Sequence, residues 1–317
     1  EGAGVFAAGD IKRGDTLMKI PFALCISVER VLTSKLKIVC DENPGLLQYP
    51  DEIMALGLMH GLDDPECPWH QHILTMPSTF NTPLFWPDED VEMLKGSIIY
   101  HLTVMMKRRI IGDFESLHEP LIREYPDLFP SASLEKYKWA MSAIYSRAIG
   151  IYRTGQYVRC MPPLLDMANH NPAECGPGIE PLAYSEDGDF LYLVSSIDTP
   201  AGSQVYVRYQ SYPNSKLLYS YGFVLSDCPD KAIDLWPRVP PTVYRASEKD
   251  ALLKSHALTA EQTYDFKGTI RERYVSPALL ATCRVIKTEE DDWEFVENAF
   301  NGKMVSVKNE LAAYESL

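Results

Sequence analysis

One short stretch of the sequence places two side chains with binding or catalytic potential next to each other. Residues 163–172 read PLLDMANHNP, in which Asn169 and His170 stand side by side after an apolar run. The imidazole could be a metal ligand, a proton shuttle, a hydrogen-bonded core residue or part of a ligand cradle. The amide beside it carries two donors and an acceptor, enough to hold an ammonium or carboxylate group. Taken alone, His170 is best interpreted as a core histidine.

The sequence offers one candidate metal cluster, formed by Cys160, His170 and Cys175. Its spacing matches no standard zinc pattern, and a zinc hydrolase built on it would lack the expected carboxylate-rich ligand set. The 7 cysteines are scattered, odd in number and contain no CxxC pair. We therefore expect neither a metal site nor a disulfide framework, and a reducing compartment is the default.

Further residue types could contribute to a ligand site. Gly2 and Gly4 would let backbone groups approach a ligand closely, although alone they are better explained as an ordinary turn. Arg147 could cover an aromatic face while bonding to a carboxylate, but a solvated arginine at a helix end fits equally well. Each of the 18 tyrosines, Tyr209 and Tyr221 included, is on its own better explained by core packing.

The composition is that of a globular protein. The chain has 317 residues, 46% of them hydrophobic and 23% charged, enough for one large domain or two modest ones. The net charge is −14, and no run rich in Lys or Arg offsets it. Nucleic-acid binding requires a basic surface, so we expect none. The acidic surface either keeps the chain soluble or attracts a basic protein substrate.

No membrane segment is expected. The longest apolar run, residues 98–106, is interrupted by His101 and is far shorter than the roughly 20 residues of a membrane helix. No signal peptide is visible, although the chain opens on Glu1 rather than Met, which leaves the removal of a leader open. We predict an intracellular protein, cytoplasmic or nuclear, with an organelle also open.

The elements that must position these residues follow from the periodicity of the sequence. Strands are predicted where short apolar runs lie between turn residues, at 5–11, 16–26, 157–165, 190–197 and 203–209. Helices are predicted where apolar residues recur at helical spacing or charges suit the helix ends, at 50–62, 88–109 and 133–148, with a loop at 63–87. After residue 225, capping patterns predict further helices, starting at Ser247, at Thr259 with Gln262, and at Ser276.

The order of elements is strands, helices, strands, helices. This is not the alternating βαβ order of a nucleotide-binding sheet. We predict an α+β architecture in which a β-rich domain carries a helical insertion and is followed by a smaller, mostly helical domain.

Four segments in the same order and at similar intervals resemble the SET-domain methyltransferases, in the branch typified by the Rubisco large-subunit methyltransferase. The matching segments are Glu1-Gly2-Ala3-Gly4, Ser146-Arg147, Asp166-Met167-Ala168-Asn169-His170, and residues 202–209 followed by Asn214 and Tyr221-Gly222-Phe223. The insertion matches as well, at Trp69, Met76-Pro77, residues 82–86 and residues 94–97. Each motif is weak alone, but together they are specific and cover nearly the whole chain.

The resemblance implies a β-rich SET fold of short strands, split by a helical insertion and followed by a helical substrate-binding domain. On this chain the SET domain would cover residues 1–225, with the insertion at about 41–145, and the C-terminal domain would cover residues 226–317. Few stretches of that last domain echo the family, so a Rubisco-like target is not implied.

The resemblance also implies an enzyme that transfers a methyl group from S-adenosylmethionine to the ε-amine of a lysine in a protein substrate. The amine must be neutral to attack, and deprotonating a lysine of pKa about 10.4 at pH 7 costs roughly 4 to 5 kcal/mol. A narrow, dry channel lowers that cost, and tyrosine hydroxyls and backbone carbonyls can aim the lone pair. The reaction requires no metal. We expect a protein substrate, no nucleic-acid or membrane partner, and a monomer.

The matched motifs also imply the site residues, position by position. Those implied to bind the cofactor are Glu1, Gly2, Ala3, Arg147, Asn169, His170, Tyr209 and Phe223. Those implied to be catalytic are Tyr209 and Tyr221, the second of which lines the channel for the target amine. Those implied on the substrate side are Ser146, Asp166 and Tyr221.

Departures from the family pattern leave alternatives open. A histidine-methylating branch carries tryptophan before the Asp and asparagine two residues after the Arg, whereas this chain has Leu165 and Ile149, which favours lysine. Gln210 follows Tyr209 where many members have glycine, which leaves the place of Asn214 open. The alternative from another class is a catalytically silent SET-fold binding module. Its mark would be loss of the tyrosine or of the Asn-His pair, and both are present.

Overall fold

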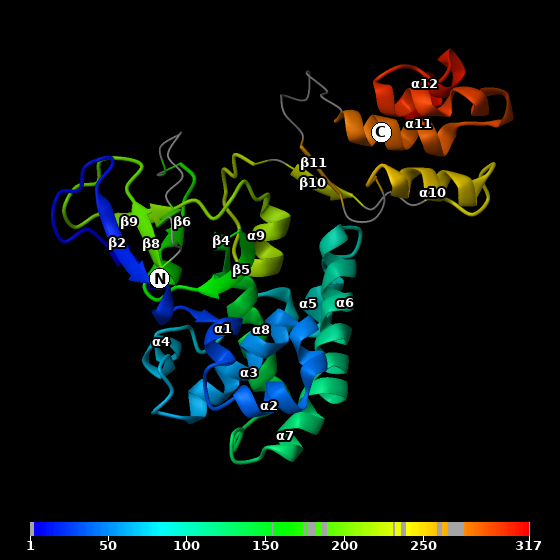
Figure 1. Ribbon diagram of the computed structural model, residues 1–317. Coiled ribbons are helices and arrows are strands. Elements are labelled where there is room, and N and C mark those ends of the chain that lie inside the picture. The colour runs from blue at the N-terminus through cyan, green and yellow to red at the C-terminus, as the bar shows by residue number, and fades with distance from the viewer. Residues whose placement is uncertain are drawn as a thin grey trace. The chain divides into compact units, whose positions relative to one another are not determined.

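The computed structural model describes residues 3–153, 155–173, 175, 182–185, 189–230, 232–235, 239–258, 262–265 and 276–316. The chain forms two compact units (Figure 1). The N-terminal unit comprises residues 1–211 with 217–223, and the C-terminal unit comprises residues 212–216 with 224–317. In the described part of the chain, no helix is both long and apolar enough to cross a membrane.

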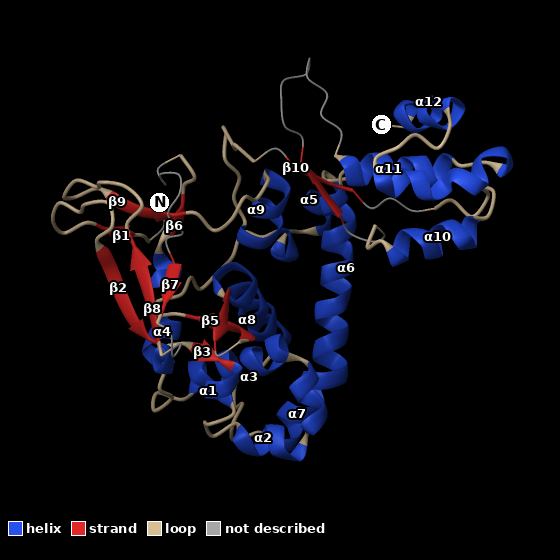
Figure 2. Cartoon of the chain, turned by 45° about the horizontal axis from the view of Figure 1, so that its top comes forward, coloured by secondary structure: helices blue, strands red, loops and turns tan. Residues whose placement is uncertain are grey.

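Short strands make up the β-rich part of the N-terminal unit. They are β1 (Val5–Phe6), β2 (Thr16–Pro21), β3 (Ile26–Ser27), β4 (Ile149–Arg153), β5 (Gln156–Met161), β6 (Asn169–His170), β7 (Leu182–Tyr184), β8 (Phe190–Val194) and β9 (Gln204–Val207). Among the described residues they form three small sheets, ordered β1-β9-β6, β2-β8-β7 and β3-β5-β4 (Figure 2). Alternation along β8 buries Leu191 and Leu193 on one face, which is the period of a half-buried strand.

The sheet of β1, β9 and β6 brings together three distant parts of the sequence. Val5 pairs with Val205 in an antiparallel arrangement, and Asn169 pairs with Tyr206 in a parallel one. A parallel pair needs a long connection, and residues 171–203 supply it here. The N-terminal segment therefore lies beside the Asn-His pair through β9.

Helices fill the chain between β3 and β4. They are α1 (Val28–Val31), α2 (Lys37–Glu42), α3 (Pro50–Asp63), α4 (His70–Leu74), α5 (Asp88–Glu92), α6 (Ile98–Asp113), α7 (Glu119–Glu124) and α8 (Leu134–Arg147). Helix α3 is buried continuously from Glu52 to Gly61, so it forms the centre of this layer. Helix α8 packs on it and begins at Ser133, whose hydroxyl accepts the Lys136 N–H as an N-cap.

The structure corrects several sequence-based boundaries. The predicted helix at 88–109 is two helices, because Gly96 adopts φ +90° between α5 and α6. The predicted loop at 63–87 contains α4, and the predicted strand at 157–165 ends at Met161 before a short 3-10 turn (Leu165–Met167). The order of strands, helices and strands, and hence the α+β class, is confirmed.

The C-terminal unit is mostly helical. Its elements are α9 (Asn214–Tyr221), which begins in this unit and ends in the other, β10 (Ala232–Leu235), α10 (Ala246–Ser255), β11 (Gln262–Asp265), α11 (Pro277–Lys287), a 3-10 helix (Glu290–Asn301) and α12 (Val307–Glu315). The predicted cap at Ser276 is confirmed, since its hydroxyl accepts the Leu279 N–H. The helix predicted near Ser247 is present as α10, but it begins at Ala246 without a side-chain cap. Thr259 lies outside the described residues, and Gln262 opens a strand paired with β10 rather than continuing a helix.

A buried lysine of this unit, Lys249, bonds to backbone carbonyls at the end of α11. Lys249 is 1% exposed and donates from Nζ to the carbonyls of Ile286 and Thr288, at 2.9 and 2.5 Å. These are carbonyls at the end of α11, where a cation satisfies groups that the helix leaves unpaired. Burial lowers the pKa of Lys249, with Glu289 opposing that effect.

Candidate functional site

Asn169 lies at the centre of an amide cradle. Its Nδ2 donates to the carbonyl of Ala3 at 3.1 Å and to Oε1 of Gln204 at 2.7 Å, which joins β6, β9 and the segment before β1. Gly4 lies directly against this pair, because a Cβ there would sit 2.8 Å from Gln204 Oε1 and 3.0 Å from Asn169 Nδ2. Glycine at position 4 is therefore required by space.

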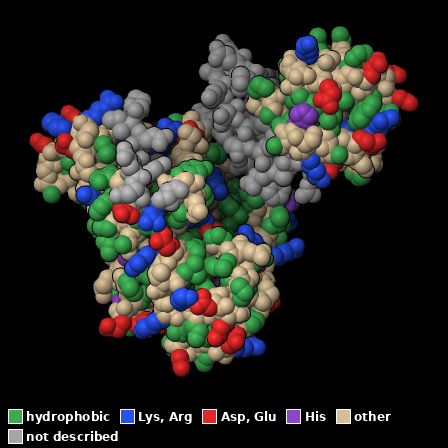
Figure 3. All heavy atoms as spheres, in the orientation of Figure 1, with side chains coloured by type: hydrophobic (Ala, Val, Ile, Leu, Met, Phe, Trp, Pro, Cys, Tyr) green, Lys and Arg blue, Asp and Glu red, His purple; other side chains and the backbone are tan. Residues whose placement is uncertain are grey.

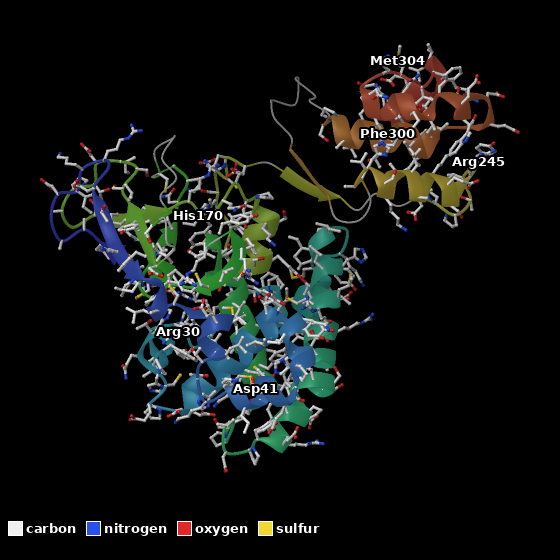
Figure 4. All side chains as sticks on the ribbon, viewed as in Figure 1. Arg30, Asp41, His170, Arg245, Phe300 and Met304 are labelled. Carbon is white, nitrogen blue, oxygen red and sulfur yellow. The ribbon has the colours of Figure 1, made fainter. Side chains whose placement is uncertain are left out.

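His170 is held inside the fold by Tyr209. Its Nδ1 accepts the backbone N–H of Tyr209 at 3.0 Å, and the two rings stack with centroids 5.0 Å apart. An imidazole whose Nδ1 accepts a hydrogen bond carries its proton on Nε2 when neutral. Figure 4 labels His170 at the end of β6. The ring is 7% exposed and contributes packing and alignment to the site.

Tyr209 is the centre of an aromatic cluster. Its ring stacks on Tyr221 at 4.8 Å, and Phe223 lies 6.3 Å from Tyr221 and 6.2 Å from His170. The Tyr209 hydroxyl donates to the carbonyl of Ala168 at 3.1 Å. The faces of such rings attract a positively charged ligand.

The ionisation of Tyr209 is shifted by its surroundings. Burial raises the pKa of its phenol, the charge of Arg147 opposes that rise, and the charge of Asp166 adds to it. A phenol with a raised pKa stays protonated at neutral pH, so the hydroxyl acts as a hydrogen-bond donor.

Arg147 and Asp166 form an ion pair whose charges act on Tyr209. Arg147 Nη1 donates to the backbone carbonyl of Asp166 at 2.7 Å and lies 3.2 Å from its Oδ2. The same oxygen lies 3.1 Å from Nε2 of His72, which comes from α4 in the helical insertion. Ser146, next to Arg147 on α8, donates its hydroxyl back to the carbonyl of Ser142 at 2.7 Å.

The insertion also contacts the aromatic cluster through Gly222. This residue adopts φ +79°, and a Cβ on it would lie 2.6 Å from the carbonyl oxygen of Asn81. Both the conformation and the close approach demand glycine. Trp86 donates its indole N–H to the Asn81 side chain at 3.1 Å, which steadies that loop.

The structure brings together most of the residues that the sequence singled out. They are Ala3, Arg147, Asp166, Asn169, His170, Tyr209, Tyr221 and Phe223, with Ser146 next to Arg147. Glu1 and Gly2 lie outside the described residues. Asn214, whose place was left open, exchanges two hydrogen bonds of 2.8 Å with the backbone of Leu225.

Sequence reasoning missed two residues of this site. Gln204 could have been found, because it lies inside a matched motif and on a predicted strand. His72 gave no signal, since it lies in a predicted loop and meets Asp166 only through the fold. Cys160 is fully buried, and the described residues hold no group of three or more side chains suited to a metal ion.

Comparisons with known proteins find similar chains among protein N-methyltransferases. Residues 240–317 match the family model described as Rubisco LSMT substrate-binding. The chloroplastic [fructose-bisphosphate aldolase]-lysine N-methyltransferase of Arabidopsis thaliana is 28% identical, over 95% of this chain and 62% of that protein. The chloroplastic Rubisco large-subunit N-methyltransferase of Pisum sativum is 26% identical, over 95% of this chain and 61% of that protein. The actin-histidine N-methyltransferase of Mus musculus is 24% identical, over 92% and 49%.

The fold matches solved structures of the same kind. The SET domain of LSMT bound to lysine and AdoHcy superposes with a TM-score of 0.77 and 25% identity, over 94% of this chain and 67% of that one. Rubisco LSMT bound to AdoMet gives a TM-score of 0.75 over 94% and 66%. The fold is thus that of the SET domain of LSMT. More particularly, the chain is LSMT-like, as its sequence motifs predicted, and it spans 62% and 61% of the length of the two plant relatives.

Proposed function

We propose that this chain is an S-adenosylmethionine-dependent protein-lysine N-methyltransferase. One observation carries the proposal: the cradle of Asn169 adjoins the aromatic cluster around Tyr209 through the neighbouring His170, within a SET fold. The cradle suits the amino-acid end of the cofactor, and the rings suit a positively charged sulfur centre and an approaching amine.

The residues present fit this cofactor on two observations. The Nε atom of Arg147 and the Oδ1 atom of Asp166 are buried and have no hydrogen-bond partner within the described chain. One donor and one acceptor at the site are therefore available to a ligand. Gly4 lets the backbone lie close to the cradle, since a Cβ at this position would collide with Gln204 and Asn169. When bound, S-adenosylmethionine supplies a methyl group on a cationic sulfur.

We propose for each site residue the role that the sequence motifs imply. The proposed cofactor-binding set is Glu1, Gly2, Ala3, Arg147, Asn169, His170, Tyr209 and Phe223. Tyr209 and Tyr221 are the proposed catalytic pair, and their stacked rings would exclude water from the amine and so favour its neutral form. Ser146, Asp166 and Tyr221 are proposed for the substrate side, where the enclosed Asp166 carboxylate, paired with Arg147, suits an electrostatic role.

Tyr209 would act by orientation. Its hydroxyl is fixed by the Ala168 carbonyl, and its raised pKa keeps it a donor rather than a base. Donors and carbonyls fixed in this way align an attacking lone pair with the bond to be broken, which is a positioning effect.

The substrate is proposed to be a protein, recruited by the C-terminal part of the chain. The match of residues 240–317 to a substrate-binding family model supports that view and the proposed division into a SET domain at 1–225, with an insertion at about 41–145, and a C-terminal domain at 226–317. Leu165 and Ile149 support lysine as the target. An actin-histidine N-methyltransferase among the relatives keeps histidine as the second candidate.

Partners and location complete the proposal. We propose no nucleic-acid partner because the net charge is −14. On the face seen in Figure 3, Lys and Arg side chains are interspersed with Asp and Glu. We propose a monomer without a membrane partner, located in the cytoplasm, the nucleus or an organelle. The chloroplastic names of two relatives support the last of these locations.

The test uses labelled S-adenosylmethionine with three purified proteins, namely aldolase, the Rubisco large subunit and actin, and maps the labelled residue by mass spectrometry. We expect label on lysine. Label on histidine would move the chain to the second candidate. A chain that neither transfers label to any of these proteins or to a cell extract nor binds AdoHcy by calorimetry would refute the enzymatic proposal.

A further inference from the structure

The carboxylate of Asp166 is fully enclosed, with 0% of its side chain exposed. A buried carboxylate is costly unless donors compensate its charge. Arg147 Nη1 and His72 Nε2 both lie close to Oδ2, at 3.2 and 3.1 Å. Since Oδ1 has no hydrogen-bond partner among the residues that the structure describes, these two donors carry the compensation together.

His72 is presented to Asp166 from a firmly anchored helix. Immediately before α4, Trp69 Nε1 donates to the Gly57 carbonyl on α3 at 3.1 Å. At the start of α4, His70 Nδ1 lies 2.6 Å from the Gly61 carbonyl, also on α3. The His72 side chain is itself only 7% exposed. Because the ring is already ordered in the fold, its hydrogen bond costs little further entropy.

The turn that carries Asp166 leads straight into the candidate site. Two residues later, the Ala168 carbonyl accepts the Tyr209 hydroxyl at 3.1 Å, and the next residue is Asn169, the centre of the amide cradle. Holding Asp166 in place therefore limits where Ala168 and Asn169 can lie.

We propose that His72 is a positioning residue, which reaches from the helical insertion to hold Asp166 and, through it, sets the place of the cofactor cradle. This inference rests on the proposed methyltransferase function. His72 contacts Asp166 rather than the cradle or the aromatic cluster, so its loss acts on cofactor binding. The Ala168 carbonyl holds only the hydroxyl of Tyr209, whereas its backbone and ring are held by His170 through a hydrogen bond and ring stacking, so the chemical step is affected less than cofactor binding.

The test compares substitutions of His72 that differ in one property. His72→Leu keeps most of the bulk and removes the donor, whereas His72→Gln keeps an N–H donor at about the reach of Nε2. Gln71→Leu is the matched control, because this neighbour on the same helix is exposed and lies outside the contacts that anchor α4. AdoHcy affinity is measured by calorimetry, KM for S-adenosylmethionine and kcat with labelled cofactor, and folding by thermal unfolding, all on the full chain.

We expect His72→Leu to raise both the AdoHcy Kd and the cofactor KM by about tenfold, as for loss of one donor to a buried carboxylate. We expect kcat to stay within about threefold, because the chemistry does not use this ring directly. His72→Gln should recover most of the affinity, and Gln71→Leu should behave like wild type.

Three results would overturn the inference while leaving the proposed function intact. They are a His72→Leu variant with wild-type affinity, a folded His72→Gln variant as impaired as His72→Leu, and an equal loss in Gln71→Leu. A double variant with Asp166→Asn adds a fourth test, since additive effects would mean that His72 does not act through Asp166. A wild-type chain that neither binds AdoHcy nor transfers label would instead refute the proposed function, and the inference with it.

Discussion

The helical insertion and the candidate site each contain a buried carboxylate that is paired with a histidine, and the two are satisfied differently. In the insertion, Oε2 of Glu52 accepts hydrogen bonds from His118 Nε2 at 2.8 Å and from the Tyr137 hydroxyl at 2.5 Å. Its other oxygen lies 3.7 Å from Arg109 Nη2. Both oxygens of this carboxylate therefore face donors.

At the site, Asp166 shares one oxygen between Arg147 and His72, and the other oxygen has no partner in the described chain. In both clusters the histidine Nδ1 is also buried without a partner among described residues. The difference lies in the carboxylates. Both oxygens of Glu52 face donors, so this group stabilises the fold, whereas Oδ1 of Asp166 has no partner in the described chain and could accept a hydrogen bond from a ligand. The comparison predicts that the two clusters respond differently to substitution.

The largest effect is expected from Glu52→Ala. It leaves His118 and Tyr137 buried without their shared acceptor, so the free energy of unfolding should fall by about 3–5 kcal/mol. AdoHcy affinity of the folded fraction should stay the same. Urea unfolding followed by circular dichroism measures the first quantity and calorimetry the second.

Glu42→Ala is the control for that experiment, because Glu42 accepts a hydrogen bond from Tyr125 at the surface. Its effect on unfolding should be much smaller. Equal losses in the two variants would contradict the stabilising role assigned to the Glu52 cluster.

Tyr209→Phe tests the role of the aromatic cluster at the candidate site. It keeps the ring stacking and removes the hydroxyl that the Ala168 carbonyl holds. We expect kcat to fall by about a hundredfold, since positioning is lost, while AdoHcy affinity and stability change little. Tyr152→Phe, in an exposed tyrosine of the β4–β5 hairpin, should keep wild-type kcat. Undiminished turnover in Tyr209→Phe would remove the hydroxyl from the mechanism.

Asn169→Ala should have an intermediate effect, confined to binding. It removes the hydrogen bonds to Ala3 and Gln204, so the AdoHcy Kd should rise by about tenfold in calorimetry. Asn171→Ala is matched to it, because Asn171 lies two residues further on and caps only the local turn at Ala173. A cradle role for Asn169 fails if both variants bind AdoHcy equally well.

The smallest effect concerns pH. Burial raises the pKa of Glu52, but hydrogen bonds from His118 and Tyr137 and the charge of Arg109 outweigh it and lower the pKa below its ordinary value of 4.5. A carboxyl whose pKa is lower in the folded state stabilises the fold above pH 4.5, and this contribution is lost as the pH falls through the folded pKa. Glu52→Gln should therefore show a flatter dependence of unfolding free energy on pH below 4.5. An unchanged slope would show that Glu52 carries no such linkage.

The sequence predicted the centre of the site because its residues lie in contiguous motifs. Asn169, His170 and Tyr209 occupy short segments whose spacing is preserved along the chain, so they could be assigned before any contact was known. The strands that carry them, β6 and β9, follow from apolar runs that end in polar residues.

The outer part of the site could not be predicted in this way. His72 lies on a helix of one and a half turns, too short to give a helical period, and it meets Asp166 across 94 residues of sequence. The strand at Gln262 was mistaken for a helix start because capping residues also occur in turns, and its pairing with β10 is a tertiary fact. Local sequence patterns thus predict individual helices and strands, whereas contacts between distant residues decide which of them meet at the site.

The arrangement of β1, β9 and β6 has a consequence for synthesis of the chain. Val5 in β1 pairs with Val205 in β9, and the ribosome makes Val205 about 10 to 40 seconds after Val5 at usual elongation rates. Until Gln204 has been made, the amide cradle cannot form, because Asn169 bonds both to Gln204 and to Ala3 in the N-terminal segment. A nascent chain paused before residue 204 would hold a nearly complete helical layer and no ligand pocket. Ligand binding to ribosome-bound chains of increasing length would therefore begin abruptly, after β9 has left the exit tunnel.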